Sequence, residues 1–427
     1  MIIFVFIIMT LFWFIYSIKH RNLLHPLTFI YLGFYIPLLF YNFNWSKLID
    51  TTKSTKFDFI IISFTFLTIC FCLMTNKNVK KVNNCERIVA TKVGKYMTKW
   101  LTIIWIFLYL IENYMGSGSF FPALAKIDAH KISVPIISYF TNSSFIVTSL
   151  NLLMYKATKK KKNLLYIAIC LIIPVMTRSS RMATFISVIQ LITLFFICFK
   201  LNKNSFSWKK SKYKYILVAI ILIAFIVYMG KLTNTRMNHY GKYDLDYGET
   251  IQYTGPGFFG IMEVYYGYFP MSFNNLKINL LYNKTVKHNY IGLYSYTSFW
   301  YGLLQLDNIF GINSGAYLDG RLVSSGAATV ATGFWEFWYD YGFLAFIPMI
   351  VAFAITRFIL TNASKEKNKM TYRVLYAWFI PFWFFTSFQN VLFQSVNIVV
   401  FIILYNLIKK SFIIVKYDEF GNERGIK

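Results

Sequence analysis

The chain has 427 residues, of which 57% are hydrophobic and 20% aromatic, and its formal net charge is +27. This composition is too apolar for a soluble globular protein. The basic residues lie in short segments between apolar runs, which argues against a nucleic-acid-binding surface. We therefore expect an all-α polytopic membrane protein.

Apolar runs of near-membrane length recur along the chain from its first residues. Because about 20 helical residues cross the bilayer core, we expect 11 transmembrane helices with one long extracytoplasmic loop. The first run lacks a basic start and a small-residue cleavage site, so we expect an uncleaved helix rather than a signal peptide. The expected helices cover residues 2–18, 27–43, 57–74, 98–115, 136–155, 163–177, 182–199, 215–230, 338–360, 374–388 and 391–408.

Lys and Arg residues collect in alternate connections between these helices. One set of connections holds 30 of the 44 basic and 5 of the 17 acidic residues, while the opposite set holds 14 and 12. Cytoplasmic loops are enriched in Lys and Arg, so the first set is assigned to the cytoplasm. The N-terminus is then outside, and the tail of residues 411–427 is cytoplasmic.

Two arginines, Arg178 and Arg181, interrupt the apolar sequence at an outer turn, VMTRSSRMATF (175–185). The preceding run is about 22 Å long as a helix, whereas the hydrocarbon core is about 30 Å thick. The turn is therefore expected to lie in a recess, where charged groups are candidates for function. Paired guanidinium groups suit phosphate oxygens. The alternatives are contact with lipid phosphates or pairing with a carboxylate such as Glu112.

The outer loop of residues 231–337 differs from every other connection. It holds 13 of the 32 Tyr residues but only 8 of the 45 Phe residues, as expected for a wet contact surface. Loops of this length are usually functional or disordered, and this one is too apolar for disorder. The runs 257–273 and 290–306 are expected to lie on the membrane or dip into it as interfacial helices. A structural cap or an interfacial aromatic belt is the alternative.

The loop contains two further candidate anion ligands, Arg236 and Arg321. Local ion pairs are the alternative for both, with Asp244 or Asp246 for Arg236 and with Asp319 for Arg321.

Candidate proton acceptors follow from position and spacing. His239 lies three residues after Arg236, and His288 precedes the aromatic run NYIGLYSYTSFW. Glu336 and Asp340 are four residues apart, which places them on one helical face. Either pair can also be merely polar surface.

The sequence has no HExxH, no zinc-type Cys/His spacing, no GxSxG and no phosphate-binding glycine loop. We therefore expect chemistry without a metal or a cofactor on an anionic substrate reached from outside.

Four segments resemble those of the Wzy-type oligosaccharide repeat unit polymerases of bacterial O-antigen and capsule pathways. They are NLLHPLTFIYLGFYIP, MTRSSRMATF, YIGLYSYTSFWYGL and ATGFWEFWYDYGFLAFIPMI. The architecture resembles the family over most of the chain. The resemblance implies a multi-pass protein of the bacterial cytoplasmic membrane that joins undecaprenyl-diphosphate-linked repeat units at the outer face. It also implies membrane lipids as partners, with the pathway's chain-length regulator and flippase as further candidates, and no nucleic acid.

The resemblance also gives site residues. Arg181 matches the family's SR turn best, with Arg178 beside it, and Arg236 and Arg321 are looser candidates for diphosphate binding. Asp340 matches an acidic position before Gly342, although Tyr341 stands between them, so a catalytic and a structural role both stay open. The catalytic candidates are Asp340, Glu336, His239 and His288. The glycan-binding candidates are Tyr294, Tyr296, Trp300 and Trp335.

Three other functions compete with this interpretation. An O-antigen ligase differs only in the acceptor, which the sequence does not show. A lipid-linked oligosaccharide flippase is expected to have two related halves, and the halves here look unrelated. A structural membrane subunit would make the outer Arg and Tyr residues incidental. The sugars, the linkage and the choice between O-antigen and capsule also stay open.

Overall fold

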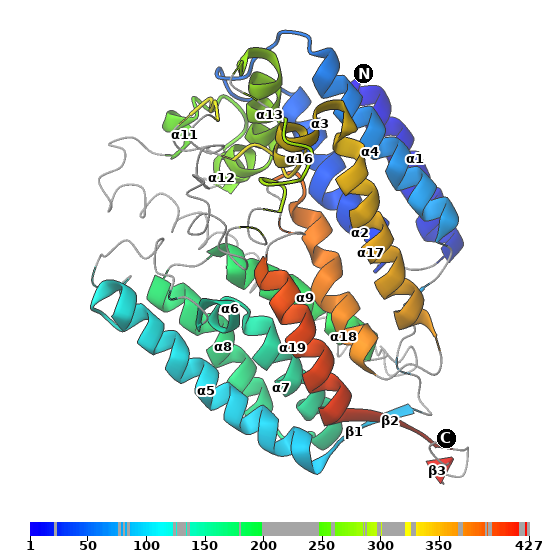
Figure 1. The fold of residues 1–427 in the computed structure, drawn as a ribbon, viewed down its shortest axis with the longest axis vertical. Helices are drawn as coiled ribbons and strands as arrows, with labels where there is room; N and C mark the ends of the chain where they lie inside the picture. Colours follow the sequence, from blue (N-terminus) through cyan, green and yellow to red (C-terminus); the bar gives the residue numbers. More distant parts are fainter. Residues whose placement is uncertain are drawn as a thin grey trace. The chain divides into compact units, whose positions relative to one another are not determined.

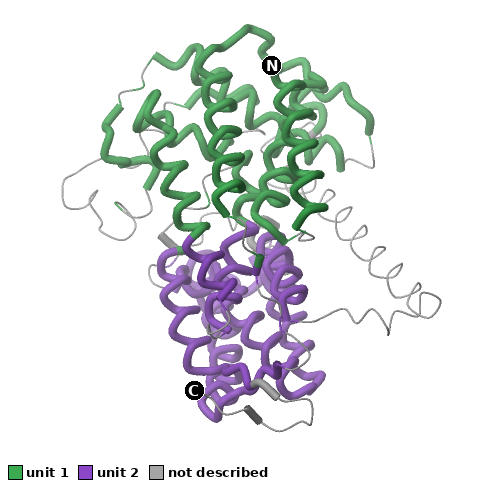
Figure 2. The backbone as a smooth tube through the Cα atoms, turned by 90° about the vertical axis from the view of Figure 1, so that its right-hand side faces the viewer, with its two compact units in different colours: residues 1–78, 222–357, 382–397 green, residues 79–221, 358–381, 398–427 purple. Residues whose placement is uncertain are grey.

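The computed structural model is mainly helical (Figure 1). It describes the chain except for residues 21–23, 76–77, 80–81, 83–85, 123–124, 126–133, 135–136, 179–180, 199–246, 258–260, 285, 287, 297–299, 301–320, 326–329, 366–369, 389–390, 392–394, 418–422 and 425–427. The chain forms two compact units (Figure 2). Unit 1 comprises residues 1–78, 222–357 and 382–397, and unit 2 comprises residues 79–221, 358–381 and 398–427.

Helical structure is found at every expected transmembrane segment except 215–230, which lies outside the described residues. The first half has α1 (Ile2–His20), α2 (Pro26–Ile30), η1 (Tyr31–Tyr35), α3 (Ile36–Asn42), α4 (Thr55–Met74), α5 (Lys92–Ser117), α6 (Ile137–Thr141), α7 (Ser144–Thr158), α8 (Lys162–Arg178) and α9 (Arg181–Cys198). The second half has α16 (Phe334–Tyr341), η5 (Gly342–Ala345), α17 (Phe346–Ser364), α18 (Met370–Phe379), η6 (Ile380–Phe385) and α19 (Ser395–Ser411).

One expected span is divided. The run 136–155 forms α6 and α7, with a break at Asn142 and Ser143. Asn and Ser side chains compete for backbone hydrogen bonds and so favour helix ends, which accounts for the break.

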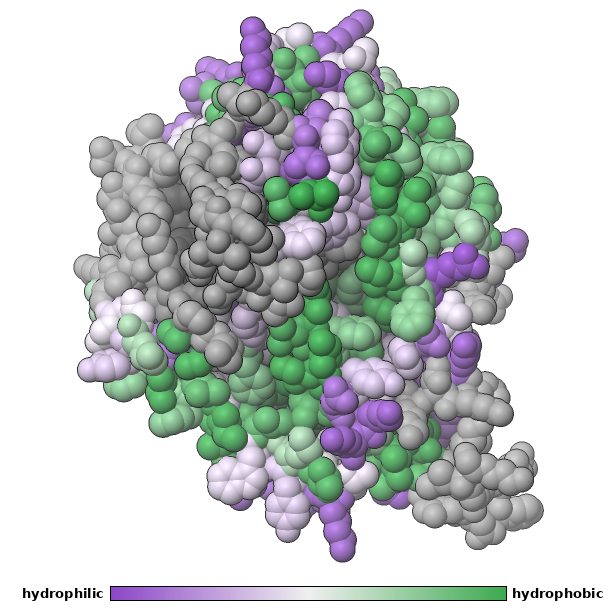
Figure 3. Space-filling view, viewed as in Figure 1, coloured by the Kyte–Doolittle hydropathy of each residue, from purple (hydrophilic) through white to green (hydrophobic). Residues whose placement is uncertain are grey.

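Three described helical segments are long and apolar enough to cross a membrane: Ile2–His20, Thr55–Met74 and Phe334–Ser364. Shorter apolar helices cover Pro26–Asn42, Lys162–Val175 and Thr184–Cys198. Apolar side chains such as Ile62, Phe66 and Ile350 are exposed, and Figure 3 shows such side chains covering α4 and α17. These features support a helical membrane protein, while the total of 11 spans and their orientation stay predictions.

Capping residues explain where α4 begins and where α5 begins and ends. Ser54 accepts a hydrogen bond from the Phe57 amide at 3.3 Å, which caps α4. The Thr91 hydroxyl does the same for Gly94 at 2.9 Å at the start of α5. Gly118, at φ +72°, ends α5 in the left-handed conformation that favours glycine. Local sequence therefore defines both ends of α5.

The core of unit 1 is aromatic. Phe34, Phe64 and Phe334 form a triangle with ring centroids 4.6–5.4 Å apart. Trp383 stacks on Phe353 at 4.7 Å and donates a hydrogen bond to the Thr356 hydroxyl at 3.0 Å. Because Phe334 is the first residue of α16, this core fixes the position of the helix that carries Asp340.

Gly33 allows two backbones to meet in the same core. A Cβ atom at this position would lie 2.1 Å from the Phe384 carbonyl oxygen. The Ser387 hydroxyl donates a hydrogen bond to the Gly33 carbonyl at 2.5 Å. Only glycine permits so close an approach of η1 to η6.

The described part of the outer loop contains helices that pack in part against the rest of unit 1. Residues 231–337 include α11 (Tyr247–Thr250), α12 (Ile261–Tyr268) and α13 (Pro270–Tyr282). Met271 and Phe273, from the run 257–273, are fully buried, so this run packs into unit 1 instead of lying wholly on a membrane. In the second run, residues 290–296 form bends and turns, and Trp300 is the one other residue that the structure describes.

Unit 2 contains a small antiparallel sheet that an all-α fold does not include. Strand β1 (Glu86–Ala90) pairs with β2 (Phe412–Tyr417), and β2 pairs with β3 (Glu423–Arg424). The register joins Glu86 to Lys416 and Ala90 to Phe412. The sheet is a small addition to the expected helical fold, and the expected tail, residues 411–427, supplies β2 and β3.

Candidate functional site

The candidate site in unit 1 is the contact between α16 and residues 288–296. Asp340 on α16 is fully buried. One carboxylate oxygen, Oδ2, accepts hydrogen bonds from the backbone amides of Tyr294 at 3.1 Å and Ser295 at 2.5 Å. The other, Oδ1, accepts from the Asn289 side chain and from the Tyr294 amide at 3.2 Å. The carboxylate is thus surrounded by donors from a single segment.

The backbone of Asp340 holds the same segment. Its carbonyl oxygen accepts hydrogen bonds from the amides of Asn289 and Tyr290, both at 3.1 Å. The Asn289 side-chain oxygen in turn accepts from the amides of Ile291, Gly292 and Leu293 at 3.0–3.3 Å. Asn289 and Asp340 together therefore satisfy almost every backbone donor of this tight turn, which includes Tyr290 at φ +59° and Gly292 at φ +76°.

This arrangement presents an aromatic surface. The rings of Tyr294 and Tyr339 meet edge to face with centroids 4.6 Å apart. Burial raises the pKa of Tyr294, and burial raises the pKa of Tyr296 to about 12, so both phenols stay protonated at neutral pH. Trp300 donates its indole hydrogen to the Gly292 carbonyl at 3.1 Å. Aromatic rings with polar edges are suited to bind sugar rings.

His288 is the exposed base next to this surface. Its Nδ1 lies 3.0 Å from the Tyr339 carbonyl oxygen, and because a carbonyl can only accept, Nδ1 carries the proton. In the neutral ring, Nε2 then holds the lone pair and can accept a proton. A Cβ atom at Gly342, which has φ +55°, would lie 2.8 Å from Nε2, so glycine makes room for the imidazole.

The predicted carboxylates differ in their surroundings. Glu336 is half-buried, and its backbone carbonyl accepts a hydrogen bond from the Ser295 hydroxyl at 3.1 Å. Asp340 has no exposed surface, and its two oxygens are occupied by the donors named above. The geometry therefore favours a structural role for Asp340, and its predicted role as a base stays without geometric support.

The glycan-binding candidates also differ in their exposure. Tyr294, Tyr296 and Trp300 are partly exposed. Trp335 is fully buried, and it packs against Tyr339 with ring centroids 5.5 Å apart. Trp335 therefore has a packing role in this structure rather than a place on the aromatic surface.

Arg321 is positioned by an asparagine pair on α13. Asn279 accepts a hydrogen bond from the Leu322 amide at 2.9 Å and donates one to the Leu322 carbonyl at 2.7 Å. Asn275 accepts from the Ser324 amide at 2.9 Å. Sequence reasoning missed this clamp, although the i, i+4 spacing of the two asparagines on one helical face was a visible signal.

The remaining candidates lie elsewhere. Arg178 ends α8 and Arg181 begins α9, in unit 2, and residues 179–180 between them lie outside the described residues. Arg236 and His239 lie outside the described residues. Within the described residues no cluster of His, Cys, Asp and Glu has the makings of a metal site.

Unit 2 contains a buried carboxylate, Glu112, whose sequence position suggests only an ion pair with the arginines of the outer turn. Glu112 is fully buried. It accepts hydrogen bonds from the hydroxyls of Ser138 and Thr141, both at 2.5 Å, and from the Val134 amide at 3.3 Å. These contacts fasten α6 to α5.

Comparisons of the chain with protein-family models, with curated proteins and with solved structures find no match.

Proposed function

We propose that this chain is a membrane glycosyltransferase that joins undecaprenyl-diphosphate-linked oligosaccharide repeat units at the outer face of the bacterial cytoplasmic membrane. The observation that carries the proposal is the exposed imidazole of His288 beside the partly exposed ring of Tyr294, which packs on Tyr339. The Nδ1 proton of His288 is held by the Tyr339 carbonyl at 3.0 Å. A base beside a sugar-binding surface is what activation of an acceptor hydroxyl requires.

The proposed reaction is a substitution at the anomeric carbon of the donor sugar. An acceptor hydroxyl oxygen forms the new bond to this carbon, and the bond to the lipid diphosphate breaks. The hydroxyl proton moves to Nε2 of His288, and the electron pair leaves with the diphosphate. Fixed positive charge stabilises this leaving group as its charge develops, a role we assign to Arg181 and Arg178, with Arg321 and Arg236 as further candidates.

Asp340 has a positioning role in this proposal. By accepting hydrogen bonds from the amides of Tyr294 and Ser295, it holds the aromatic segment against α16, the helix that also carries Tyr339, the carbonyl partner of His288. The membrane-length segment Phe334–Ser364 begins at the same helix, which suits a site whose donor and acceptor are both lipid-linked.

The test is polymerisation by the purified full chain with a synthetic lipid-linked repeat unit, followed as a ladder of products on a gel. His288→Gln is expected to slow polymerisation about 100-fold, as for loss of a general base. His20→Gln, a partly exposed histidine elsewhere in unit 1, is the matched control and is expected to have no effect. If His288→Gln polymerised at the wild-type rate at equal amounts of folded protein, His288 would be excluded as the general base.

The arginine role has a separate test in cells. Arg181→Ala is expected to abolish long polymer while single repeats stay on the lipid carrier. A normal ladder from this variant at matched expression would exclude the turn from the site. Transfer onto a different lipid acceptor would instead identify a ligase, and repeats stranded on the cytoplasmic side would identify a flippase.

A further inference from the structure

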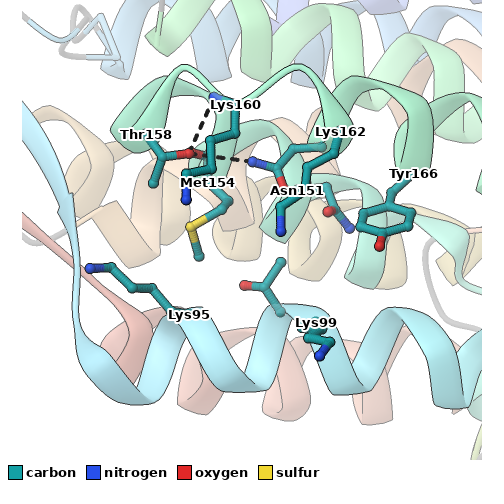
Figure 4. Close-up of a pocket in the computed structure, with 10 residues that line it drawn as sticks. Lys95, Lys99, Asn151, Met154, Thr158, Lys160, Lys162 and Tyr166 are labelled. Carbon is teal, nitrogen blue, oxygen red and sulfur yellow. Dashed lines mark hydrogen bonds between the residues drawn. The ribbon is translucent and has the colours of Figure 1, made fainter.

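A second polar site lies in unit 2 and is lined by none of the residues assigned above. A cavity of about 260 Å³ separates the start of α5 from the turn that joins α7 to α8. In Figure 4, α5 carries Lys95 and Lys99 on one side, and Lys160 and Lys162 extend toward it from the other. Four lysine residues thus line one small cavity.

The sequence brings these lysines together by local geometry. Lys95 and Lys99 are four residues apart and share one face of α5. The α7 helix ends where Lys159 adopts φ +59°, and α8 begins at Lys162. The Thr158 hydroxyl accepts hydrogen bonds from the Lys160 amide at 3.4 Å and the Asn163 side chain at 3.5 Å, which shapes the turn.

The charge of the cavity is uncompensated by protein. Among the described residues that line it, no side chain is an aspartate or a glutamate. All four lysine side chains are exposed, and all four residues line this one cavity. Like charges that face a common space repel one another, and an anion bound between them removes this repulsion.

The inner wall of the cavity supplies a polar group without a partner. Asn151 is fully buried and donates hydrogen bonds to the Thr102 hydroxyl at 2.8 Å and the Val147 carbonyl at 2.9 Å. Its side-chain oxygen has no hydrogen bond to any described residue. A buried hydrogen-bond acceptor without a donor costs folding free energy. A hydroxyl group of a ligand would supply the missing donor to the Asn151 oxygen.

Apolar side chains continue from the lysines along both helices. On α5, Ile103 and Phe107 follow Lys99 at successive turns and are 42% and 63% exposed. On α8, Leu165 and Ile172 follow Lys162 and are 60% and 56% exposed. A soluble phosphate would gain nothing from these surfaces, whereas acyl chains would cover them.

We propose that this lysine pocket binds the headgroup of an anionic glycerophospholipid. The phosphate lies between Lys95, Lys99, Lys160 and Lys162, a headgroup hydroxyl donates to Asn151, and the acyl chains follow the apolar faces of α5 and α8. The site is independent of the proposed transferase activity.

Native mass spectrometry of the full chain, released from a neutral detergent, tests the proposal. Phosphatidylglycerol is titrated against phosphatidylcholine of the same chain length. We expect phosphatidylglycerol to be retained preferentially, and Lys99→Gln/Lys162→Gln to weaken its binding about 30-fold, since each surface lysine contributes to anionic lipid binding. The matched control is Lys409→Gln/Lys410→Gln, two exposed lysines of unit 2 on α19, which is expected to bind like wild type.

Other outcomes overturn the proposal. Equal retention of the two lipids, or equal losses in both double variants, would show that the lysines act only as general surface charge. Inorganic pyrophosphate that binds as tightly as the lipid and displaces it would make the pocket a site for a soluble phosphate. The circular dichroism spectrum of each variant without lipid confirms its fold, and single Lys99→Gln replaces the double variant if that spectrum changes.

Discussion

Replacing Asp340 by asparagine separates a structural carboxylate from a catalytic one. The change keeps the size of the side chain but substitutes an NH₂ group for one carboxylate oxygen. Three donors converge on this carboxylate: the Asn289 side chain and the amides of Tyr294 and Ser295. The Asn289 side-chain amide cannot flip to compensate, because its oxygen already accepts hydrogen bonds from three backbone amides. At least one buried donor therefore loses its acceptor.

The expected size follows from this loss. A hydrogen bond to a charged group contributes about 1.5–3 kcal/mol, and every 1.4 kcal/mol corresponds to a roughly tenfold change in an equilibrium constant. Amide hydrogen exchange at Tyr294 and Ser295 is expected to become about 10- to 150-fold faster, because local opening of the segment is easier by that amount.

Hydrogen-exchange mass spectrometry of the peptide that covers residues 288–296 measures this change. Asp58→Asn, in the first turn of α4 in the same unit, is the control and is expected to leave the peptide unchanged. If Asp340→Asn abolished activity while exchange in the peptide stayed at the wild-type rate, the carboxylate would be a reacting group, and the positioning argument would be refuted.

Three further predictions concern stability. Arg373 and Glu86 form a buried ion pair with a 3.5 Å separation. Glu86→Gln is therefore expected to destabilise the protein by about 3–5 kcal/mol, measured by thermal unfolding in detergent. The control Arg87→Gln, at an exposed neighbour on β1, should show no comparable loss. Gly33→Ala places a Cβ atom 2.1 Å from the Phe384 carbonyl oxygen, while Gly118→Ala meets open space at φ +72°. Gly33→Ala is expected to lower the melting temperature much more than Gly118→Ala, which costs only about 1–2 kcal/mol. Equal melting temperatures of the two variants would contradict the close approach of the backbones. Burial acts to raise the pKa of Asp50, but hydrogen bonds from Thr52 and Tyr282 and the charge of Lys277 together outweigh it and hold that pKa below its ordinary value of 3.8. The stability that Asp50 contributes is therefore present above pH 3.8 and lost as the pH falls through the folded-state pKa. Asp50→Asn should therefore reduce the fall in unfolding temperature at acid pH.

Long apolar runs made the helices predictable. The helices α1, α4, α8 and α9 coincide with expected spans to within a few residues, because a continuous apolar run has few alternatives to a helix in a membrane. The sheet was not predictable in the same way. ERIVA and FIIVKY are short β-branched runs, and each becomes a strand only by pairing with the other.

The site shows a similar division. Sequence position gave His288 and Asp340 as candidates, and the family resemblance gave Tyr294 and Tyr296. The structure brings all four to one contact between α16 and the 288–296 turn. Their roles could not be predicted, since the donors that enclose Asp340 come from a segment about 45 residues earlier in the chain. No periodicity of a helix or strand reports such a contact.

The pairing of β1 with β2 has a consequence for synthesis. Ala90 leaves the ribosome about 320 residues before its partner Phe412, a delay on the order of half a minute at ordinary elongation rates. During that interval the hydrogen-bonding edge of β1 has no native neighbour, and such an edge can pair with another chain. The nascent protein therefore needs β1 to be shielded, by the lipid surface or by a chaperone, until translation reaches the segment that completes it.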